Sequence, residues 1–334
     1  MIRLNREFVV FSACIIFIFI YLCSVMISND NNNYDVLYDG SVKVREMRRF
    51  KNVIVHLDLK GAPPKVEYLE RIFPLLAENY VDGVLIEYED MFPYDGDLKM
   101  VTRENFYTKE DVERINKAAH NNNLEVIPLI QTFGHLEFIL KKTKYQWISE
   151  TPMELNTVCV SEKSTFKLIE NMLKQIRDLH PNSTRIHIGA DEAFHIGEDD
   201  RCQNRMRHEK INTSDLKLQH ISRVGKMAKD AGFSTVFAWN DMFDKETIDN
   251  IRKAEIQKYI TPVVWGYRAD VTEPGYFPDG LFDRIYKVFD NFYVAGAFKG
   301  ANGIQQQFSN ISRYLETQMS YVKLMELHED VSVS

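Results

Sequence analysis

The stretch RIHIGADE, residues 185–192, joins a short apolar run to two adjacent carboxylates. Six further apolar runs of similar length occur along the chain, and amphipathic segments with apolar residues three and four apart separate them. Alternation of buried-type strands with helices is typical of a parallel sheet in an α/β fold. The predicted strands are 53–59, 82–89, 124–131, 185–191, 234–241, 260–267 and 292–299, and the predicted helices include 66–80, 109–121, 164–180, 216–231 and 305–327.

The order of these elements favours one closed barrel over an open sheet. The strand–helix units follow one another at roughly 25–60 residues, as in a (β/α)8 TIM-type barrel. No Gly-rich dinucleotide-binding turn follows the first strand, which argues against a doubly wound sheet. Seven such units are found, one fewer than a closed barrel of this type contains.

Polar residues occupy one parity of the predicted strands, although strands covered on both faces should be apolar throughout. In a barrel one parity points inward, and the C-terminal strand ends form the mouth where active sites lie. The early polar positions His56, Glu87 and His187 are expected to form a structural network in the interior. The later positions are site candidates: Asp58, Glu89, Gln131, Asp191, Trp239, Asp241, Trp265 and Tyr267.

Asp191 and Glu192 are the strongest candidates for catalysis. Neighbours in a regular strand face opposite sides, so both carboxylates can reach one pocket only if the strand ends at about Ala190. Two adjacent carboxylates repel each other, so at least one should be protonated or hydrogen-bonded. A protonated Glu192 beside an ionised Asp191 is the pairing of acid and electrostatic partner that glycosidases use. The alternative is that this pair only begins a helix.

Aromatic residues support a sugar site at the same mouth. Trp239 and Trp265 end successive strands, and Tyr267 shares the parity of Trp265. Their flat faces suit the C–H face of a sugar ring or the methyl of an N-acetyl group, although core packing is the alternative. Asp241 is a candidate for binding sugar hydroxyls or for capping the next helix. His135 lies just beyond the third strand, with no second histidine at metal-ligand spacing, so no metal is expected.

Composition narrows the class of protein. The chain has 334 residues, 45% of them hydrophobic, and a net charge of −7. No basic cluster occurs beyond Arg45–Lys51, which argues against a nucleic-acid partner. Four cysteines cannot build a disulfide scaffold in a chain of this length. Cys159 and Cys202 could pair in an oxidising compartment or remain buried thiols, and the oligomeric state stays open, a homodimer included.

The N-terminus predicts a membrane anchor. Phe8–Ile27 contains twenty residues without a charge, which is enough for a bilayer core of about 30 Å and longer than the apolar part of a cleaved signal peptide. Arg3 and Arg6 precede it, whereas residues 28–42 contain no Lys or Arg. The positive-inside rule therefore predicts a cytosolic tail (residues 1–7) and a luminal or extracellular body. Residues 28–50 are predicted to form a stalk, and residues 51–334 the barrel domain.

Three glycosylation sequons agree with a luminal body: Asn182-Ser-Thr, Asn212-Thr-Ser and Asn310-Ile-Ser. We expect Asn182 to be the most accessible, because Pro181 ends the preceding helix. Asn310 should be the least accessible, because it lies within a predicted helix.

Several long motifs resemble glycoside hydrolase family 20. They are HLDLKGAPPKVEYLERIFPLL (56–76), LIEYEDMFPYDG (85–96), LEVIPLIQTFGHLEF (124–138), RIHIGADEAFHIGE (185–198) and AFKGANG (297–303). The resemblance implies a (β/α)8 barrel and an exo-acting β-N-acetylhexosaminidase that needs neither metal nor organic cofactor. Its substrate would be a glycan that ends in β-linked GlcNAc or GalNAc.

The resemblance also implies roles for single residues. The Asp-Glu pair of the family falls on Asp191 and Glu192, and its mechanism uses the 2-acetamido oxygen of the substrate as the nucleophile. Glu192 would protonate the leaving oxygen and then activate water, while Asp191 would orient the acetamido nitrogen, so that configuration is retained. His135 matches the family's histidine after the third strand, and Trp265 and Tyr267 take the place of its acetamido-pocket aromatics.

Three features depart from the family pattern. The family's eighth strand, with its pocket-lining Trp, should follow the predicted helix that ends near Leu327, but Ser334 is reached without one. We therefore expect a barrel that lacks its eighth strand and leaves the first and seventh strands with unpaired edges. The predicted anchor is a second departure, and Asn240 is a third, since an acidic residue is expected there. These departures keep open an alternative, a catalytically inactive glycan-binding or regulatory remnant of a glycosidase barrel.

Overall fold

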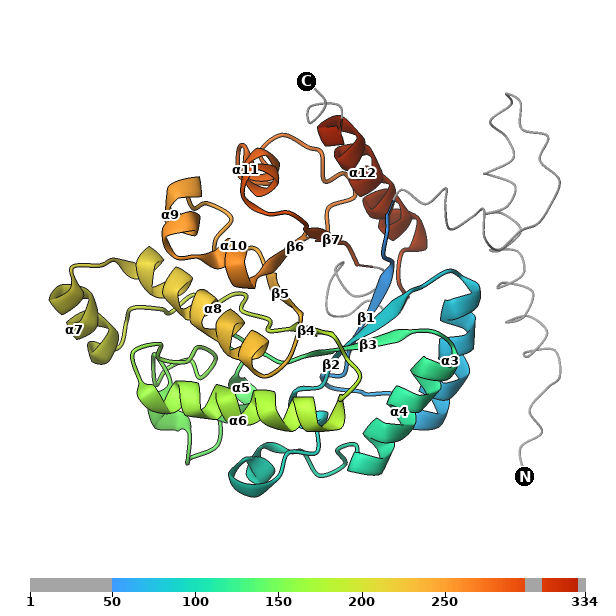
Figure 1. The fold of residues 1–334 in the computed structure, drawn as a ribbon, viewed down its shortest axis with the longest axis horizontal. Helices are drawn as coiled ribbons and strands as arrows, with labels where there is room; N and C mark the ends of the chain where they lie inside the picture. The colour runs from blue at the N-terminus through green and yellow to red at the C-terminus, as the bar shows by residue number, and fades with distance from the viewer. Residues whose placement is uncertain (1–49, 298–307, 330–334) are drawn as a thin grey trace. The chain divides into compact units, whose positions relative to one another are not determined.

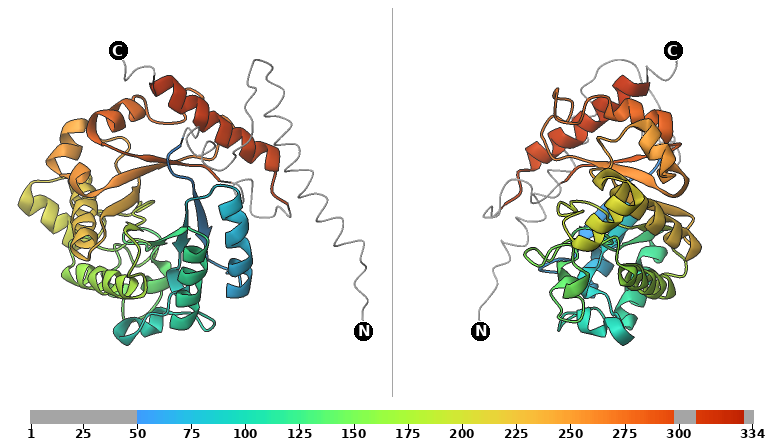
Figure 2. Two further views of the ribbon diagram at one scale, coloured as in Figure 1. Left: turned by 45° about the vertical axis from the view of Figure 1, so that its right-hand side comes forward. Right: turned by 90° about the vertical axis from the view of Figure 1, so that its left-hand side faces the viewer.

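The computed structural model describes residues 50–297 and 308–329. Within them, seven parallel strands form one sheet whose spatial order is the chain order. The sheet is curled, with helices on its outer side (Figures 1 and 2). The strands are β1 (Ile54–Asp58), β2 (Gly83–Glu87), β3 (Glu125–Leu129), β4 (Arg185–His187), β5 (Thr235–Trp239), β6 (Thr261–Trp265) and β7 (Tyr293–Ala295). All seven lie inside the predicted strand ranges, and β1 and β7 are the two edges of the sheet in the described ranges, as predicted.

The five predicted helices are present as α3, α4, α6, α8 and α12. Helices α5, α7, α9, α10 and α11 and three 3-10 turns were not predicted. Among them α7 buries only Cys202, so its sequence shows no apolar periodicity. The helix bounds are α3 (Val66–Glu78), α4 (Lys109–Asn121), α5 (Glu137–Leu140), α6 (Lys163–Leu179), α7 (Asp200–Glu209), α8 (Thr213–Asp230), α9 (Ile248–Lys253), α10 (Ile256–Tyr259), α11 (Leu281–Val288) and α12 (Ile311–Glu329); the 3-10 turns are η1 (Glu89–Met91), η2 (Gly96–Val101) and η3 (Gln146–Ile148).

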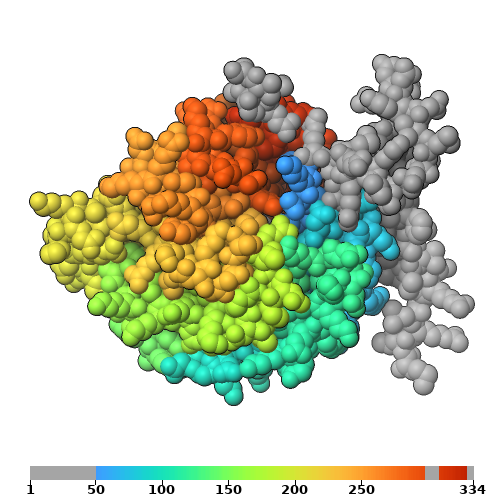
Figure 3. All heavy atoms as spheres, viewed as in Figure 1, coloured from blue at the N-terminus to red at the C-terminus, as the bar shows by residue number. Residues whose placement is uncertain are grey.

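The main hydrophobic core lies between the sheet and the helices. Ile86 on β2 and Val236 on β5 point to this side and are fully buried with Phe73 of α3, Ile115 of α4 and Ile169 of α6. Side chains also fill the spaces between the ribbons on the face shown in Figure 3. The outer face of the sheet is therefore apolar and covered by helices, whereas the polar residues of the strands lie on its inner face.

A second, smaller apolar cluster lies inside the curled sheet. It contains Leu85, Ile127, Leu129, Phe237, Trp239 and Val263, all from the opposite strand parity. Toward the N-terminal strand ends, the Arg185 side chain donates to Glu125 (Nε–Oε2 2.8 Å) and to the Tyr293 hydroxyl (3.3 Å). These contacts fill the interior near the N-terminal strand ends.

The described residues test the sequons and leave the anchor untested. Asn182 lies on an exposed turn, as expected. The expectation for Asn310 is wrong, because α12 begins at Ile311 and exposed Asn310 accepts a hydrogen bond from the Arg313 backbone N–H. Phe8–Ile27 and residues 298–303 of the last family motif lie outside the described ranges. Inside those ranges, no helix is both long and apolar enough to span a bilayer.

Candidate active site

A cavity of about 250 Å³ opens at the C-terminal ends of the strands. Strand register brings the last residues of neighbouring strands to one level, since Asp58 pairs with Glu87 and Trp265 with Ala295. The cavity is lined by His56, Asp58, Lys60, Glu87, Gln131, His135, Asp191, Glu192, Trp239, Trp265 and Tyr267. Most of the predicted site residues therefore meet in one place, and Glu89 and Asp241 are the two predicted residues that do not line it.

The end of β4 explains how two adjacent carboxylates reach the same cavity. β4 stops at His187, and Gly189, Ala190 and Glu192 then have positive φ values of 62°, 68° and 48°. Left-handed backbone is unfavourable for residues with a Cβ, and such strain is concentrated at functional sites. The irregular turn replaces the alternation of a strand, so Asp191 and Glu192 both line the cavity. This confirms that the strand must end by Ala190.

His135 joins the two carboxylates. Its Nε2 lies 3.3 Å from Asp191 Oδ2 and 3.2 Å from Glu192 Oε2. Gly134 allows this approach, because a Cβ at that position would lie 2.2 Å from the Asp191 carbonyl oxygen. The carboxylate of Asp191 raises the pKa of His135 to about 9, despite partial burial. His135 is therefore an imidazolium at neutral pH, and its positive charge lies between the two neighbouring carboxyl groups.

Asp191 keeps one atom available to a ligand. Its Oδ2 faces His135, whereas Oδ1 is buried and has no hydrogen-bond partner among the described residues. A buried acceptor without a partner is costly, and native proteins usually satisfy such atoms with water or a ligand. Asp191 lines the cavity, so Oδ1 is the oxygen of this side chain that a donor from water or a ligand would satisfy.

Asp241 lies behind the cavity wall. Its Oδ2 accepts from the Glu192 backbone N–H (2.9 Å) and its Oδ1 from the Trp265 indole N–H (3.1 Å). Burial raises the pKa of Asp241 to about 6, against the lowering effect of these two donors. Asp241 does not line the cavity, and each of its oxygens already accepts one protein donor, so its predicted binding of sugar hydroxyls stays a prediction. Neighbouring Asn240 likewise accepts from the Trp265 backbone N–H (3.3 Å).

Aromatic rings form one wall of the cavity. The Trp265 and Tyr267 ring centroids are 5.2 Å apart with an interplanar angle of 33°. Trp239 is 8% exposed, and its ring centroid lies 4.3 Å from that of His187. It belongs to the inner apolar cluster and also lines the cavity. Burial raises the pKa of Tyr267 to about 12, which keeps its hydroxyl protonated as a donor. The wall combines apolar ring faces with a polar tip, as the sequence predicted.

The ends of β1 and β2 add charged groups that sequence analysis partly missed. Lys60 lines the cavity, and its Nζ lies 2.8 Å from Glu89 Oε1. Glu89 is 7% exposed and has a positive φ of 44°, and burial raises its pKa to about 7 against the effect of Lys60. Glu89 does not line the cavity itself, but its carboxyl group pairs with the Lys60 ammonium group that does. Lys60 could have been found, because it follows the first strand as Asp191 follows the fourth.

The floor of the cavity is a hydrogen-bonded network. Glu87 receives a hydrogen bond from Gln131 (2.9 Å) and pairs with His56 (3.1 Å). Burial alone would raise the pKa of Glu87, but these contacts lower it to about 2. Burial lowers the pKa of His187 to about 3, and its Nδ1 accepts from the Gly189 N–H (2.9 Å). The predicted interior network is present, although His56 and Glu87 also line the cavity.

Comparison with known proteins places this arrangement in a family. Residues 84–273 match the catalytic domain of glycosyl hydrolase family 20. The chain is 36% identical to human Hexosaminidase D over 278 residues (82% of this chain, 57% of the relative) and 35% identical to bovine Hexosaminidase D over 274 residues (81% of this chain, 78% of the relative). The chain belongs to glycosyl hydrolase family 20. It spans little more than half the length of the human relative.

Solved structures of family 20 share the fold. The β-N-acetylhexosaminidase from Bacteroides fragilis superimposes with a TM-score of 0.59 at 18% identity, over 74% of this chain and 51% of that chain. The chitobiase from Flavobacterium johnsoniae gives the same TM-score and identity, over 75% of this chain and 38% of that chain. The curled parallel sheet with outer helices is therefore a TIM-type fold of the family 20 kind.

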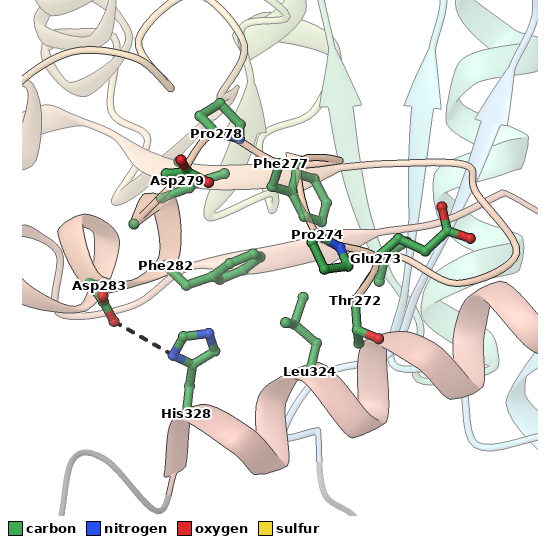
Figure 4. Close-up of a pocket in the computed structure, with 14 residues that line it drawn as sticks. Thr272, Glu273, Pro274, Phe277, Pro278, Asp279, Phe282, Asp283, Leu324 and His328 are labelled. Carbon is green, nitrogen blue, oxygen red and sulfur yellow. Dashed lines mark ion pairs between the residues drawn. The ribbon is translucent and has the colours of Figure 1, made fainter.

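Two other features in the described ranges do not belong to this family 20 site. Glu150, Cys159 and Cys202 are the single group of side chains there with the spacing of metal ligands, and none of them lines the cavity. A second cavity of about 220 Å³ lies between the β6–α11 connection, α11 and α12 (Figure 4). Phe277, Phe282 and Leu324 line it, beside an ion pair of Asp283 with His328 (3.8 Å). It shares no residue with the first cavity.

Proposed function

We propose that this chain is an exo-β-N-acetylhexosaminidase that removes terminal β-linked GlcNAc or GalNAc by substrate-assisted hydrolysis. One observation carries the proposal: the carboxyl groups of Asp191 and Glu192 both contact the Nε2 atom of His135, and Asp191 Oδ1 is a buried acceptor without a hydrogen-bond donor among the described residues. An acetamido N–H is a donor of the required kind. Membership of family 20 and similarity to the two hexosaminidases support the same activity.

The proposed reaction begins with Glu192 protonated. Glu192 gives its proton to the glycosidic oxygen while the acetamido carbonyl oxygen of the same sugar attacks the anomeric carbon and the leaving group departs. Asp191 Oδ1 accepts the acetamido N–H and stabilises the positive charge that develops on the resulting oxazolinium ring. Glu192, now a carboxylate, removes a proton from water, which attacks the anomeric carbon and reopens the ring. Two displacements at one carbon retain its configuration.

Adjacent carboxylates favour this route over a protein nucleophile. An acid and a carboxylate nucleophile must flank the glycosidic bond from two sides, about 5–5.5 Å apart. Asp191 and Glu192 instead contact one imidazole nitrogen at 3.3 and 3.2 Å, so they lie on the same side of the cavity. An intramolecular nucleophile supplied by the substrate removes the need for a second carboxylate opposite the first.

The cavity suits a single terminal sugar. Its volume of about 250 Å³ is below the roughly 300 Å³ at which pockets for drug-sized ligands begin. Trp265 and Tyr267 provide ring faces for the acetyl methyl and the sugar C–H groups, while Asp58 at the end of β1 and Lys60 just after it offer partners for hydroxyls. The lining therefore supports recognition of one N-acetylhexosamine at a chain end.

Hydrolysis of aryl glycosides tests the proposal. Purified protein should release the aryl group from aryl β-N-acetylglucosaminide or β-N-acetylgalactosaminide far faster than from the matching β-glucoside, because the acetamido group is the nucleophile. Equal rates with and without the N-acetyl group would contradict the mechanism. Binding of N-acetylglucosamine without turnover of either aryl hexosaminide would favour the inactive glycan-binding alternative.

We also propose that Phe8–Ile27 anchors the enzyme with its N-terminus in the cytosol and its catalytic body in the lumen or outside the cell. The charges that flank the segment support this orientation. Exposed Asn182 should then carry a glycan, and peptide N-glycosidase should shift the mobility of the protein but shift Asn182→Gln less. A protein without glycan, whose body is digested only by protease added to the cytosolic side, would reverse the orientation.

A further inference from the structure

A buried pair of cysteines lies next to the segment that follows Glu192. The Sγ atoms of Cys159 and Cys202 are 3.5 Å apart, both residues have no exposed surface, and neither forms a disulfide. Ser161 Oγ lies 3.1 Å and Glu150 Oε2 3.4 Å from Cys202 Sγ. The catalytic mechanism uses none of these groups, so their arrangement requires a separate explanation.

The two sulfur atoms come from different parts of the fold. Cys159 belongs to the long β3–α6 connection, where its backbone N–H donates to the Ile148 carbonyl and Val158 bridges to Ser149. Cys202 is the third residue of α7, whose N-cap is Asp199. A covalent bond between them would therefore join two segments that are 43 positions apart in sequence.

Glu150 connects this pair to the catalytic segment. Its Oε1 accepts from the backbone N–H groups of Gly197 (2.6 Å) and Asp199 (3.2 Å). Gly197 and Asp199 lie on the stretch that runs from Glu192 into α7. The same stretch is held at His195, which contacts Glu154 (2.7 Å) and Glu198 (2.9 Å). The β3–α6 connection thus supports the backbone that positions Glu192.

We propose that Cys159 and Cys202 are an oxidisable pair whose disulfide fastens the segment from Glu192 to α7 onto the β3–α6 connection. The bond requires the sulfur atoms to close from 3.5 Å to about 2.05 Å, a movement of roughly 1.5 Å. The oxidant is of the peroxide class.

One peroxide molecule is enough to oxidise the two thiols to a disulfide. The Cys202 thiolate attacks a peroxide oxygen, the O–O bond breaks, and the departing hydroxide takes up a proton to give water and a sulfenic acid. The Cys159 sulfur then attacks the Cys202 sulfur, the S–O bond breaks, and the second hydroxide takes the Cys159 proton. Two thiols and one peroxide give one disulfide and two waters.

The surroundings assign the attacking role to Cys202. A hydrogen bond from the Cys159 thiol lowers the pKa of Cys202, and the Ser161 hydroxyl acts in the same direction. The first turn of α7 also favours a negative charge at this position. Burial raises the pKa of Glu150 to about 8, so it is largely a neutral acid beside the thiolate at neutral pH.

A metal ion is the less favoured occupant of this group. The three ligand atoms lie within 4.8 Å of one another and would leave a tetrahedral ion without its fourth ligand, unless Ser161 served. Arg201, adjacent to Cys202, is already held by Asp199 (2.7 Å) and would place a positive charge beside the cation. These contacts favour a disulfide, and the experiment below distinguishes the two.

Peptide mapping of the detergent-solubilised full chain tests the bond. The reduced protein is treated with hydrogen peroxide, its remaining thiols are alkylated, and it is digested with trypsin. We expect residues 145–163 linked to residues 202–205, at the sum of the two masses minus two hydrogen atoms. The link should disappear after reduction and should be absent from Cys159→Ser and Cys202→Ser. Cys14 and Cys23 lie on another peptide and do not interfere.

Thermal unfolding without substrate tests the mechanical consequence independently of turnover. Because a cross-link restricts the unfolded chain, oxidation should raise Tm by about 5 °C in the wild-type protein and leave both serine variants unchanged. Absence of the linked peptides, or an equal shift in the variants, would overturn the proposal. Stoichiometric zinc in the purified protein, lost with peroxide while no linked peptide forms, would overturn it in favour of a metal site.

Discussion

The ends of β4 and β5 each place an aspartate at the mouth of the barrel, and the structure assigns them opposite tasks. One carboxylate oxygen of Asp191 contacts His135, and the other has no hydrogen-bond partner among the described residues. In Asp241, by contrast, each oxygen accepts a hydrogen bond from a protein donor. Asp191 is therefore available to substrate, and Asp241 positions Glu192 and Trp265. Equivalent residues on neighbouring strands thus differ by which donors surround them.

The backbone explains the difference. β4 ends early, and left-handed residues at Ala190 and Glu192 turn both carboxylates toward the cavity. β5 continues in regular form to Trp239, and the described residues from Asn240 to Asp244 have no left-handed φ. Strain is present at the strand end that would contact substrate and absent at the end that supports it. Four substitutions test this difference between the two strand ends.

The largest effect is expected for Glu192→Gln, which removes the proposed acid. Turnover of substrates with poor leaving groups should fall by about 10²–10⁴-fold, the usual contribution of general acid–base catalysis. Activated aryl leaving groups need less protonation and should lose less. Rates measured across a series of aryl leaving groups check this, and a uniform loss would mean that Glu192 has a structural role.

Asp191→Asn should cause the second-largest loss of activity, because it removes the negative charge beside the proposed oxazolinium nitrogen. We expect kcat/KM for aryl N-acetylhexosaminides to fall by roughly 10²–10³-fold, as for loss of one preorganised stabilising group. Unlike Glu192→Gln, the loss should be similar for good and poor leaving groups. A fall of less than tenfold would remove the functional distinction between Asp191 and Asp241.

Asp241→Asn is the matched control on the neighbouring strand. Its amide has one carbonyl oxygen for two donors, the Glu192 N–H and the Trp265 indole, so one buried donor loses its acceptor at about 1–3 kcal/mol. If the lost hydrogen bond raises the free energy of the transition state by that amount, kcat falls by roughly 10–10²-fold. The loss should grow with the pKa of the leaving group, because Glu192 is displaced, and a loss larger than that of Asp191→Asn would reverse the comparison.

The smallest effect is expected on stability, through His135. Its pKa is raised from 6.5 in the unfolded chain to about 9 in the folded protein, so protonation stabilises the fold below pH 6.5 and this contribution disappears as pH rises through 9. The Tm difference between wild type and His135→Gln should therefore be largest below pH 6.5 and shrink by a few degrees above pH 9. A difference independent of pH would show that the imidazolium does not hold the two carboxylates.

The strands were predictable because each is a short apolar run between helices, and the inward parity of His56, Trp239 and Trp265 follows from strand alternation alone. Helix α7 could not be predicted, since Cys202 is its only buried residue. The start of α12 was placed too early, because the sequence has no apolar signal that separates Asn310 as a cap from the helix that follows.

Local sequence patterns were enough to predict the parallel α/β fold and the position of Asp191 and Glu192 at a strand end, because apolar periodicity and polar strand ends are local features. Which of their neighbours line the cavity depended on the tertiary structure. Gly134 brings His135 to both carboxylates, Lys60 joins the lining with Glu89 behind it, and Asp241 lies beneath the wall. Whether a polar atom is free or occupied depends on donors from distant strands, and that information is absent from any single segment of the chain.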